Sequence, residues 1–248
     1  MKVCFTMTSN ASLNNITIRK SLDRGHANHG WLDSYHSFSF ASYYDPKHMD
    51  FSVLRVINED IIAGGQGFGK HPHKDMEIVT YMLSGQLQHR DSMGNGAVIG
   101  PGDVQRMTAG TGVEHSEFNA SQTKAAHLLQ IWLLPKRKNL TPSYEDKHFS
   151  DGDKHNRWCL IVSHDGRDGS LIIHQDVNVY ATKLTKGTSL PYDMQGNRSL
   201  YIQVASGRIN LNDKVLEAGD AAKLNKRMPV AIDALDASEL VVFDLPSV

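Results

Sequence analysis

The chain has 248 residues, and its 26 Lys and Arg residues nearly balance its 27 Asp and Glu residues, which gives a formal net charge of −1. This balance lacks the basic excess that binding to nucleic acid or to an anionic membrane requires, so neither partner is expected. The sequence has 40% hydrophobic residues, enough for a buried core, but no apolar run of the roughly 18 residues that a membrane helix needs. Its N-terminal segment also lacks the apolar stretch of a secretion signal, and we expect a cytoplasmic protein.

From Asn15 onward, short apolar or alternating segments are separated by Gly, Pro, Asn and Asp, a pattern typical of strands and turns. In chain order, the expected strands include residues 37–42, 53–57, 77–83, 127–134, 160–163, 171–174, 200–204 and 240–243. No long segment has the 3.6-residue period of an amphipathic helix. The sequence therefore predicts an all-β protein, built as barrels or sandwiches, with only short helical pieces.

Two short patterns recur about half a chain apart. The segment MLSGQL at 82–87 matches VASGRI at 204–209, and IGPGD at 99–103 matches LEAGD at 216–220. Such a recurrence predicts two related β-units in tandem. We expect an N-terminal unit at 13–135, a charged, proline-containing connection at 136–153 and a C-terminal unit at 154–248.

The first unit contains two pairs of metal-ligand residue types, His71 with His73 and His115 with Glu117. Residues two positions apart on a strand point to the same face, so two strands facing one interior would bring three imidazoles and a carboxylate to one point. This donor set suits a single divalent first-row transition metal with positions open for water, substrate or dioxygen. Calcium is disfavoured because it takes oxygen ligands.

Other parts of the sequence narrow the choice of site. The only cysteines, Cys4 and Cys159, are too few for a disulfide framework or a thiolate zinc site. At the positions of the second unit that correspond by distance from the repeated glycines, the sequence has four residues that do not form a ligand set: Asp193, Gln195, Ile232 and Ala234. We therefore expect only the first unit to bind metal.

Several polar and aromatic residues receive less specific expectations. Two roles remain possible for His89: contact with the rim of a pocket, or a structural hydrogen bond. The histidines in polar stretches are expected to be solvated: His26, His29, His48, His148, His155 and His164. The tryptophans Trp31, Trp132 and Trp158 are expected to be packing residues.

Longer motifs carry a resemblance to a known family. The pattern Gly65, His71-x-His73, Glu77 and Gly85 resembles the first signature of the cupin superfamily, and MTAGTGVEHSE at 107–117 resembles the second signature of its pirin family. Further pirin-like blocks are HSFSF at 36–40, YYDP at 43–46, PGDV at 101–104 and HRDSMG at 89–94, and DGS at 168–170 with HQD at 174–176 extends the resemblance into the second half.

The resemblance implies a bicupin, two tandem antiparallel β-barrels (double-stranded β-helices), with metal held only in the first barrel by His71, His73, His115 and Glu117. In many other cupins the fourth ligand is the glutamate shortly after HxH, here Glu77. Because Glu77 has the same strand parity as the two histidines, it is kept as a reserve ligand or a neighbour of the ligands.

The resemblance also implies an activity. Bacterial pirin-like proteins suggest a quercetin 2,3-dioxygenase, which opens the central ring of flavonols such as quercetin with O2 and releases carbon monoxide, with Glu117 or Glu77 accepting the 3-hydroxyl proton. Fe2+ is the first expectation, and Ni2+, Cu2+, Mn2+, Co2+ and Zn2+ also suit the donors. The alternative is a metal- or redox-responsive regulator that binds a transcription factor or a metabolic enzyme. A monomer is expected.

Overall fold

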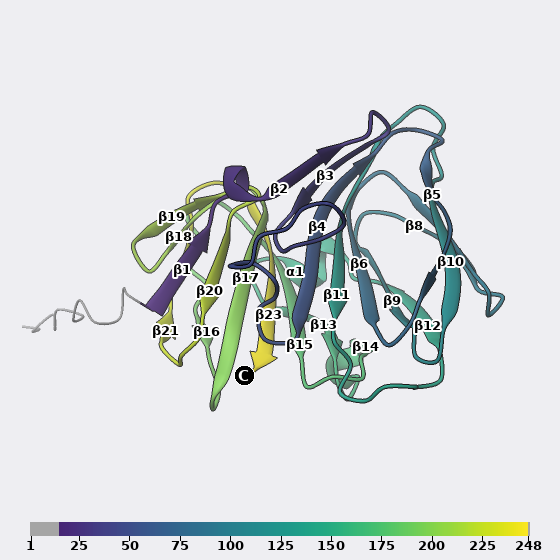
Figure 1. Cartoon of the computed structure of the whole chain (residues 1–248). Helices are drawn as coiled ribbons and strands as arrows, with labels where there is room; N and C mark the ends of the chain where they lie inside the picture. Colours follow the sequence, from purple (N-terminus) through teal and green to yellow (C-terminus); the bar gives the residue numbers. More distant parts are fainter. Residues whose placement is uncertain (1–14, 248) are drawn as a thin grey trace, which may run out of the picture.

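The computed structural model describes residues 15–247, which form β-sheets joined by turns. The helical pieces in this range are one short α-helix, α1 (Asp151–Lys154), and two 3-10 turns, η2 (Ser21–Asp23) and η3 (Arg167–Gly169). The mostly-β prediction is thus confirmed. Two groups of strands lie side by side, one from each half of the sequence (Figure 1). Within the described range, no helix has the length and apolar character needed to cross a membrane.

The N-terminal half contributes a seven-stranded and a four-stranded sheet. The larger sheet has the order β12 (Ser143–His148), β9 (Asp103–Thr108), β6 (Glu77–Ser84), β11 (Ala126–Leu133), β4 (Leu54–Ile62), β3 (Leu32–His36) and β2 (Gly25–Asn28). The smaller has the order β5 (Gly67–His73), β10 (Val113–Asn119), β7 (Leu87–Asp91) and β8 (Gly96–Ile99).

The C-terminal half repeats this arrangement. Its seven-stranded sheet has the order β1 (Ile16–Arg19), β20 (Ala221–Leu224), β17 (Arg198–Ser206), β23 (Ser238–Pro246), β15 (Asn178–Leu184), β13 (Cys159–Ser163) and β14 (Leu171–Ile172). The smaller sheets are β19 (Lys214–Glu217), β18 (Arg208–Leu211) and β22 (Ile232–Ala234), and β16 (Tyr192–Asp193) with β21 (Pro229–Val230). The described strand pairs are antiparallel except β13 with β14, which is parallel.

The repeated sequence patterns form the same turn in both halves. Gly85 lies between β6 and β7, Gly207 lies between β17 and β18, and both have positive φ, +75° and +79°. A Cβ on Gly85 would lie 2.5 Å from the carbonyl oxygen of Ala125, and one on Gly207 would lie 2.2 Å from that of Ala237. Glycine is therefore required for two reasons at each turn, the backbone conformation and the close approach of the backbone at the start of β11 or β23.

The second repeated pattern also recurs in three dimensions. In IGPGD, the Asp103 carboxylate accepts a hydrogen bond of 2.7 Å from the backbone N–H of Gly100. In LEAGD, the Asp220 carboxylate accepts one of 3.0 Å from the N–H of Glu217. The same aspartate thus closes the same tight turn before β9 and before β20, which confirms the internal repeat.

Strands are also exchanged between the halves. The strand β1 precedes the whole N-terminal sheet in sequence but pairs with β20 of the C-terminal sheet. The strand β12 lies in the segment expected as a connection and pairs with β9 of the N-terminal sheet. Each large sheet therefore has one edge strand from outside its own repeat, and the domain boundaries given above stay a prediction.

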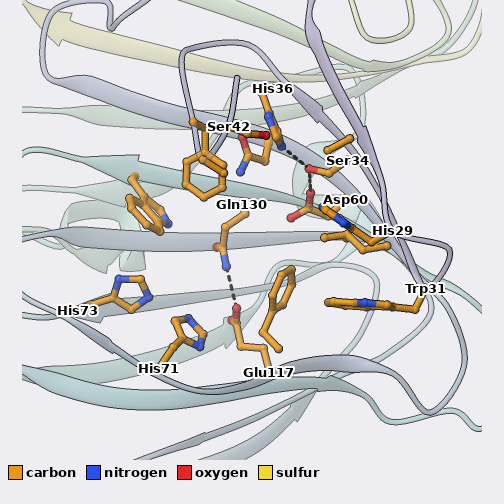
Figure 2. A pocket seen from close by; sticks show the side chains of 17 residues that line it. His29, Trp31, Ser34, His36, Ser42, Asp60, His71, His73, Glu117 and Gln130 are labelled. Carbon is orange, nitrogen blue, oxygen red and sulfur yellow. Dashed lines mark hydrogen bonds between the residues drawn. The ribbon is translucent and has the colours of Figure 1, made fainter. Parts of the chain in front are cut away.

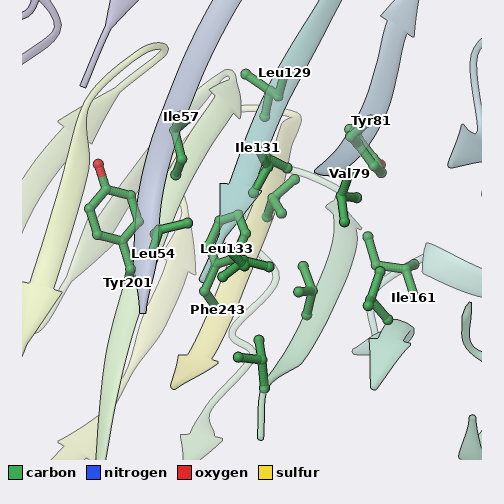
Figure 3. Packing of buried hydrophobic residues seen from close by; sticks show 14 of the residues in the cluster. Leu54, Ile57, Val79, Tyr81, Leu129, Ile131, Leu133, Ile161, Tyr201 and Phe243 are labelled. Atoms are coloured by element: carbon green, nitrogen blue, oxygen red, sulfur yellow. The ribbon is translucent and has the colours of Figure 1, made fainter. Parts of the chain in front are cut away.

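The largest apolar cluster lies between the two seven-stranded sheets. It joins Leu54, Val79 and Ile131 of the first half to Tyr201 and Phe243 of the second (Figure 3). A second large cluster fills the inside of the C-terminal half. The inside of the N-terminal half has only two small apolar clusters, around Met82 and around Met107, which leaves room there for polar groups and a cavity.

Most of the expected strands are present, but one is wrong. The segment 37–42 follows the end of β3 as bends and a turn, in which Ala41 has φ +49° and Phe40 forms an isolated bridge with Tyr43. Its alternation of apolar and polar residues reflects packing of Phe38 into the core between the sheets. The alternating pattern in this short segment therefore came from the burial of an aromatic ring and not from a strand.

The two glycine turns lead to a stability prediction. We expect Gly85→Ala and Gly207→Ala each to lower the free energy of unfolding by about 3 kcal/mol or more, because backbone strain and a backbone clash add together. Gly187→Ala is the matched control, since Gly187 also has positive φ (+84°) but open space around it, and it should cost only about 1 kcal/mol. Urea unfolding followed by tryptophan fluorescence measures all three, and equal losses would contradict the role of the close approach.

Candidate metal centre

Three histidines meet where β5 and β10 pair. His71 lies directly opposite His115 in the antiparallel register, and His73 lies opposite Val113. The ring centroids are 4.4 Å apart for His71 and His115, and 4.8 Å apart both for His71 and His73 and for His73 and His115. One ring nitrogen from each comes within 4.8 Å of the other two, a spacing that permits coordination of a single ion.

Hydrogen bonds orient the rings of His71 and His115. The Nδ1 of His71 lies 2.8 Å from the carbonyl oxygen of Gly69, which makes Nδ1 the protonated nitrogen and leaves the lone pair on Nε2. His115 is buried, and its Nε2 has no hydrogen-bond partner in the described part of the chain. Burial lowers the pKa of His115 to about 2 and that of His73 to about 4. Both rings are therefore neutral at physiological pH, as metal ligands must be.

A buried chain of polar groups lies behind His115. Its Nδ1 lies 3.5 Å from Nδ1 of His89, and the Nε2 of His89 lies 3.3 Å from a carboxylate oxygen of Asp91. Burial alone would raise the pKa of Asp91, but hydrogen bonds from Asn95 and from the backbone of Met93 hold it below its ordinary value. An ionised Asp91 fixes the proton of His89 on Nε2, so that His89 accepts from His115 and the Nε2 of His115 stays unprotonated.

Glu117 lies on the same strand as His115, two positions further on. Its two carboxylate oxygens accept hydrogen bonds of 2.7 Å from Gln105 and 2.8 Å from Gln130. Burial raises the pKa of Glu117 to about 7. A carboxylate oxygen of Glu117 groups within 4.8 Å with ring nitrogens of His89 and His115, whereas the other group consists of His71, His73 and His115. His115 is thus common to both groups.

Glu77 has different surroundings. It begins β6, on the seven-stranded sheet, where one oxygen accepts a hydrogen bond of 2.9 Å from Thr108. The other oxygen, Oε1, is buried and has no partner within residues 15–247. Burial raises the pKa of Glu77 to about 7, although Thr108 and the charge of Arg106 act in the opposite direction. Glu77 is part of neither group of ligand atoms.

A cavity of about 490 Å³ opens beside the imidazoles, between the seven-stranded and the four-stranded sheet. This volume is within the range of about 300–1,000 Å³ in which proteins enclose small organic ligands. His71 and His73 lie on one side, Glu117 and Gln130 border its middle, and Asp60 lies on the far side (Figure 2). Much of the remaining wall is apolar or aromatic, from Trp31, Leu32, Phe40, Phe68 and Trp132.

Comparisons with known proteins agree with this architecture. The family model described as Pirin matches residues 17–133, and the model described as Quercetinase C-terminal cupin domain matches residues 160–245. A protein of Escherichia coli K12 named quercetin 2,3-dioxygenase is 48% identical over 233 residues, which are 94% of this chain and 100% of that protein. The chain belongs to the pirin family.

Other members show the same relationship in sequence and structure. A pirin-like protein of Caulobacter vibrioides is 40% identical over 91% of this chain and 98% of its own length. The crystal structure of the bacterial pirin YhhW of Escherichia coli in complex with nickel(II) superposes with a TM-score of 0.90 at 47% identity, covering 94% of this chain and 100% of that one. The predicted membership in the pirin family is confirmed.

The predicted site residues of this pirin are brought together in part. The three histidines converge, Glu117 is adjacent to His115, and Glu77 lies apart from them. The corresponding positions of the C-terminal half carry no such group: Ile232 and Ala234 are buried in its apolar cluster, and Asp193 and Gln195 are exposed.

Sequence patterns missed several residues of the site. Gln105 and Gln130, which hold Glu117, lie on strands of the other sheet, and Asp91 lies in a segment with the composition of a turn. Trp31 and Trp132 line the cavity, although they were expected to be packing residues. His89 does not line this cavity and takes the structural hydrogen bond that was left open. For His89 and Asp91 the sequence offered one signal, because alternation along their strand can turn them to the same face as His115. Using that signal requires the register between the two strands to be known.

The burial of Glu77 leads to a prediction about stability and pH. A carboxyl whose pKa is about 7 in the folded protein and ordinary in the unfolded chain stabilises the fold at low pH and loses that contribution as pH rises through about 7. We expect Glu77→Gln to raise the free energy of unfolding at pH 8 by about 2 kcal/mol, a shift in melting temperature of several degrees. At pH 5 the variant and the original protein should melt at similar temperatures.

Thermal unfolding followed by circular dichroism at the two pH values measures this difference. Glu217→Gln is a suitable comparison, because Glu217 is an exposed carboxylate on β19, in the C-terminal half. A larger gain for Glu77→Gln at pH 5 than at pH 8 would contradict the assigned direction.

Proposed function

We propose that this pirin is a metal-dependent dioxygenase that opens the central ring of flavonols such as quercetin with O2. In this reaction both atoms of dioxygen enter the ring-opened product, and the carbon that bore the 3-hydroxyl leaves as carbon monoxide. The observation that carries the proposal is the convergence of three imidazoles on the side of an aromatic-lined cavity of about 490 Å³. The relative named quercetin 2,3-dioxygenase, which this chain matches over 94% of its length, supports it.

The residues fit a single divalent ion. The buried Nε2 of His115 carries a lone pair that has no partner among residues 15–247, and the ring of His71 is held with its Nε2 lone pair available. We assign His71, His73 and His115 as ligands and propose Glu117 as the fourth, since a carboxylate oxygen of Glu117 lies within 4.8 Å of a ring nitrogen of His115 and Glu77 belongs to neither group. Fe2+ is the proposed native ion, and the other divalent ions named above also suit these donors.

The bound ion would supply Lewis acidity that favours the deprotonated flavonol. The residues of the chain supply the rest. Glu117 borders the cavity beside His115, so its carboxylate can accept the 3-hydroxyl proton. Gln105 and Gln130 hold its two oxygens in place, and the aromatic walls exclude water from the reacting ring.

The finer architecture is also a proposal. We propose that each half closes into an antiparallel barrel of the double-stranded β-helix type, with boundaries at 13–135 and 154–248. The family matches at 17–133 and 160–245 support these boundaries, and the repeated turns at Gly85 and Gly207 support the relationship of the two units. The monomeric state stays a prediction.

The activity is tested with protein that is loaded with Fe2+, Ni2+ or Mn2+ under nitrogen and then mixed with quercetin in air. We expect loss of the flavonol absorption band with release of carbon monoxide, and we expect His73→Ala to lower kcat/KM by about 100-fold or more while the fold is retained. His164→Ala is the control, since His164 is exposed and lies in the C-terminal half. Unchanged quercetin with all three ions would contradict the enzyme proposal and favour the regulatory alternative.

The chain from Asp91 to His115 leads to a second prediction. We expect Asp91→Asn to weaken metal binding about 10- to 100-fold, because His89 then loses the charge that fixes its tautomer and His115 loses its acceptor. Competition with a chelator measures the affinity for Ni2+. Asp165→Asn is the matched control, since Asp165 is also a turn aspartate that accepts from a serine and an arginine side chain, far away in sequence. Equal affinities for the two variants would contradict the positioning role.

A further inference from the structure

A second polar group lines the cavity on the side away from the imidazoles. Ser34 and His36 belong to β3, and Asp60 belongs to the neighbouring strand β4, where it lies directly opposite Ser34 in the register. All three are buried, and all three border the cavity. The Ser34 hydroxyl donates to one carboxylate oxygen of Asp60, and the Nε2 of His36 lies 2.9 Å from the Ser34 oxygen (Figure 2).

The proton positions in this group follow from its hydrogen bonds. The Ser34 hydroxyl has one proton, and because that proton is donated to Asp60, the Nε2–H of His36 must donate to Ser34. Burial, with a smaller contribution from the charge of Arg24, lowers the pKa of His36 to about 4, which agrees with a neutral ring. Ser34 and His36 therefore hold Asp60 as an oriented acceptor.

The acceptors of this group are incompletely used. Figure 2 shows the second oxygen of Asp60 directed into the space between the labelled side chains, and no hydrogen bond joins it to another residue of the described range. Two other cavity residues have buried acceptors without a partner in that range, Nδ1 of His36 and Oδ1 of Asn58. An unsatisfied buried acceptor costs about 1–3 kcal/mol, so a ligand that donates hydrogen bonds here would be favoured.

The cavity thus has polar groups at two separated places, with aromatic rings among its other lining residues. His71 and His73 lie on one side and Asp60 on the other (Figure 2), and Phe40, Phe68 and Trp132 also line the cavity. Flat aromatic molecules with hydroxyl groups on opposite parts fit such an arrangement, because each buried polar group then has a partner.

We propose that Asp60, oriented by Ser34 and His36, binds a second hydroxyl group of a polyphenolic substrate, on the part of the molecule away from the imidazoles. This inference rests on the proposed function, which places the 3-hydroxyl of a flavonol at the imidazole side. It makes the protein selective for flavonols that carry further hydroxyls over flavonols that carry the 3-hydroxyl alone.

The test compares quercetin, which has further hydroxyls, with 3-hydroxyflavone, which has none. Binding is measured under nitrogen on nickel-loaded protein by quenching of tryptophan fluorescence, since Trp31 and Trp132 line the cavity. We expect the original protein to bind quercetin about 10-fold or more tightly than 3-hydroxyflavone. Asp60→Asn and Asp60→Leu should weaken quercetin binding by about that factor and leave 3-hydroxyflavone binding within about 2-fold.

Asp33→Asn is the matched control, because Asp33 lies on the same strand as Ser34 but pairs with His26, outside the cavity lining. It should keep the original preference for quercetin. Equal weakening of both flavonols by the Asp60 variants, or no effect on either, would overturn the inference, since Asp60 would then be structural or irrelevant to binding.

The same measurements separate this inference from the proposed activity. Selective binding that depends on Asp60, without turnover in air, would support the subsite and contradict the dioxygenase. If both flavonols are turned over, and if Asp60→Asn changes kcat/KM for neither of them, the dioxygenase is supported and the subsite is overturned. Failure of quercetin to bind the original protein would overturn the subsite directly.

Discussion

The antiparallel register of β5 against β10 is the constraint on which the site depends. It places His71 opposite His115 and, through strand alternation, brings His73 to the same face. A slip of one residue would turn the side chains of one strand to the opposite face and separate the imidazoles. The register shifts between His115 and Glu117, so Glu117 pairs with Phe68 instead of Gly69. Because of this irregularity, the carboxylate of Glu117 does not continue the regular pairing that brings the three imidazoles together.

The two halves have the same arrangement of strands but different interiors. In the C-terminal half, residues such as Ile232 and Ala234 fill the inside as one apolar cluster. In the N-terminal half the corresponding region carries the polar groups and the cavity, and its own apolar clusters are small. The core between the two large sheets offers apolar burial that does not depend on the site. The second half therefore supports the first by packing, which reconciles a polar interior with a stable fold.

Three of the chemically important side chains, His115, Glu117 and Asp60, are held by other buried polar groups. Asp91 acts on His115 through His89, two glutamine amides hold Glu117, and Ser34 holds Asp60. Groups arranged in this way lose little orientation freedom when a ligand arrives, because their hydrogen bonds already fix them. Where such a group still has a free lone pair, as at Nε2 of His115, that atom marks the place where a ligand or an ion is favoured.

The sequence by itself determined the β class, the internal repeat, the family and the common face of His71 and His73, because these depend on local spacing: alternation along a strand, a glycine that only a tight turn requires, and an HxH pair. Tertiary structure alone decided what depends on pairing between distant strands. It separated Glu77 from the imidazoles, placed β1 in the sheet of the other half, and brought Asp60 across the cavity from His71. Strand parity states which face a side chain shares with its neighbours, but only the register and the sheet order state which other side chains lie opposite it.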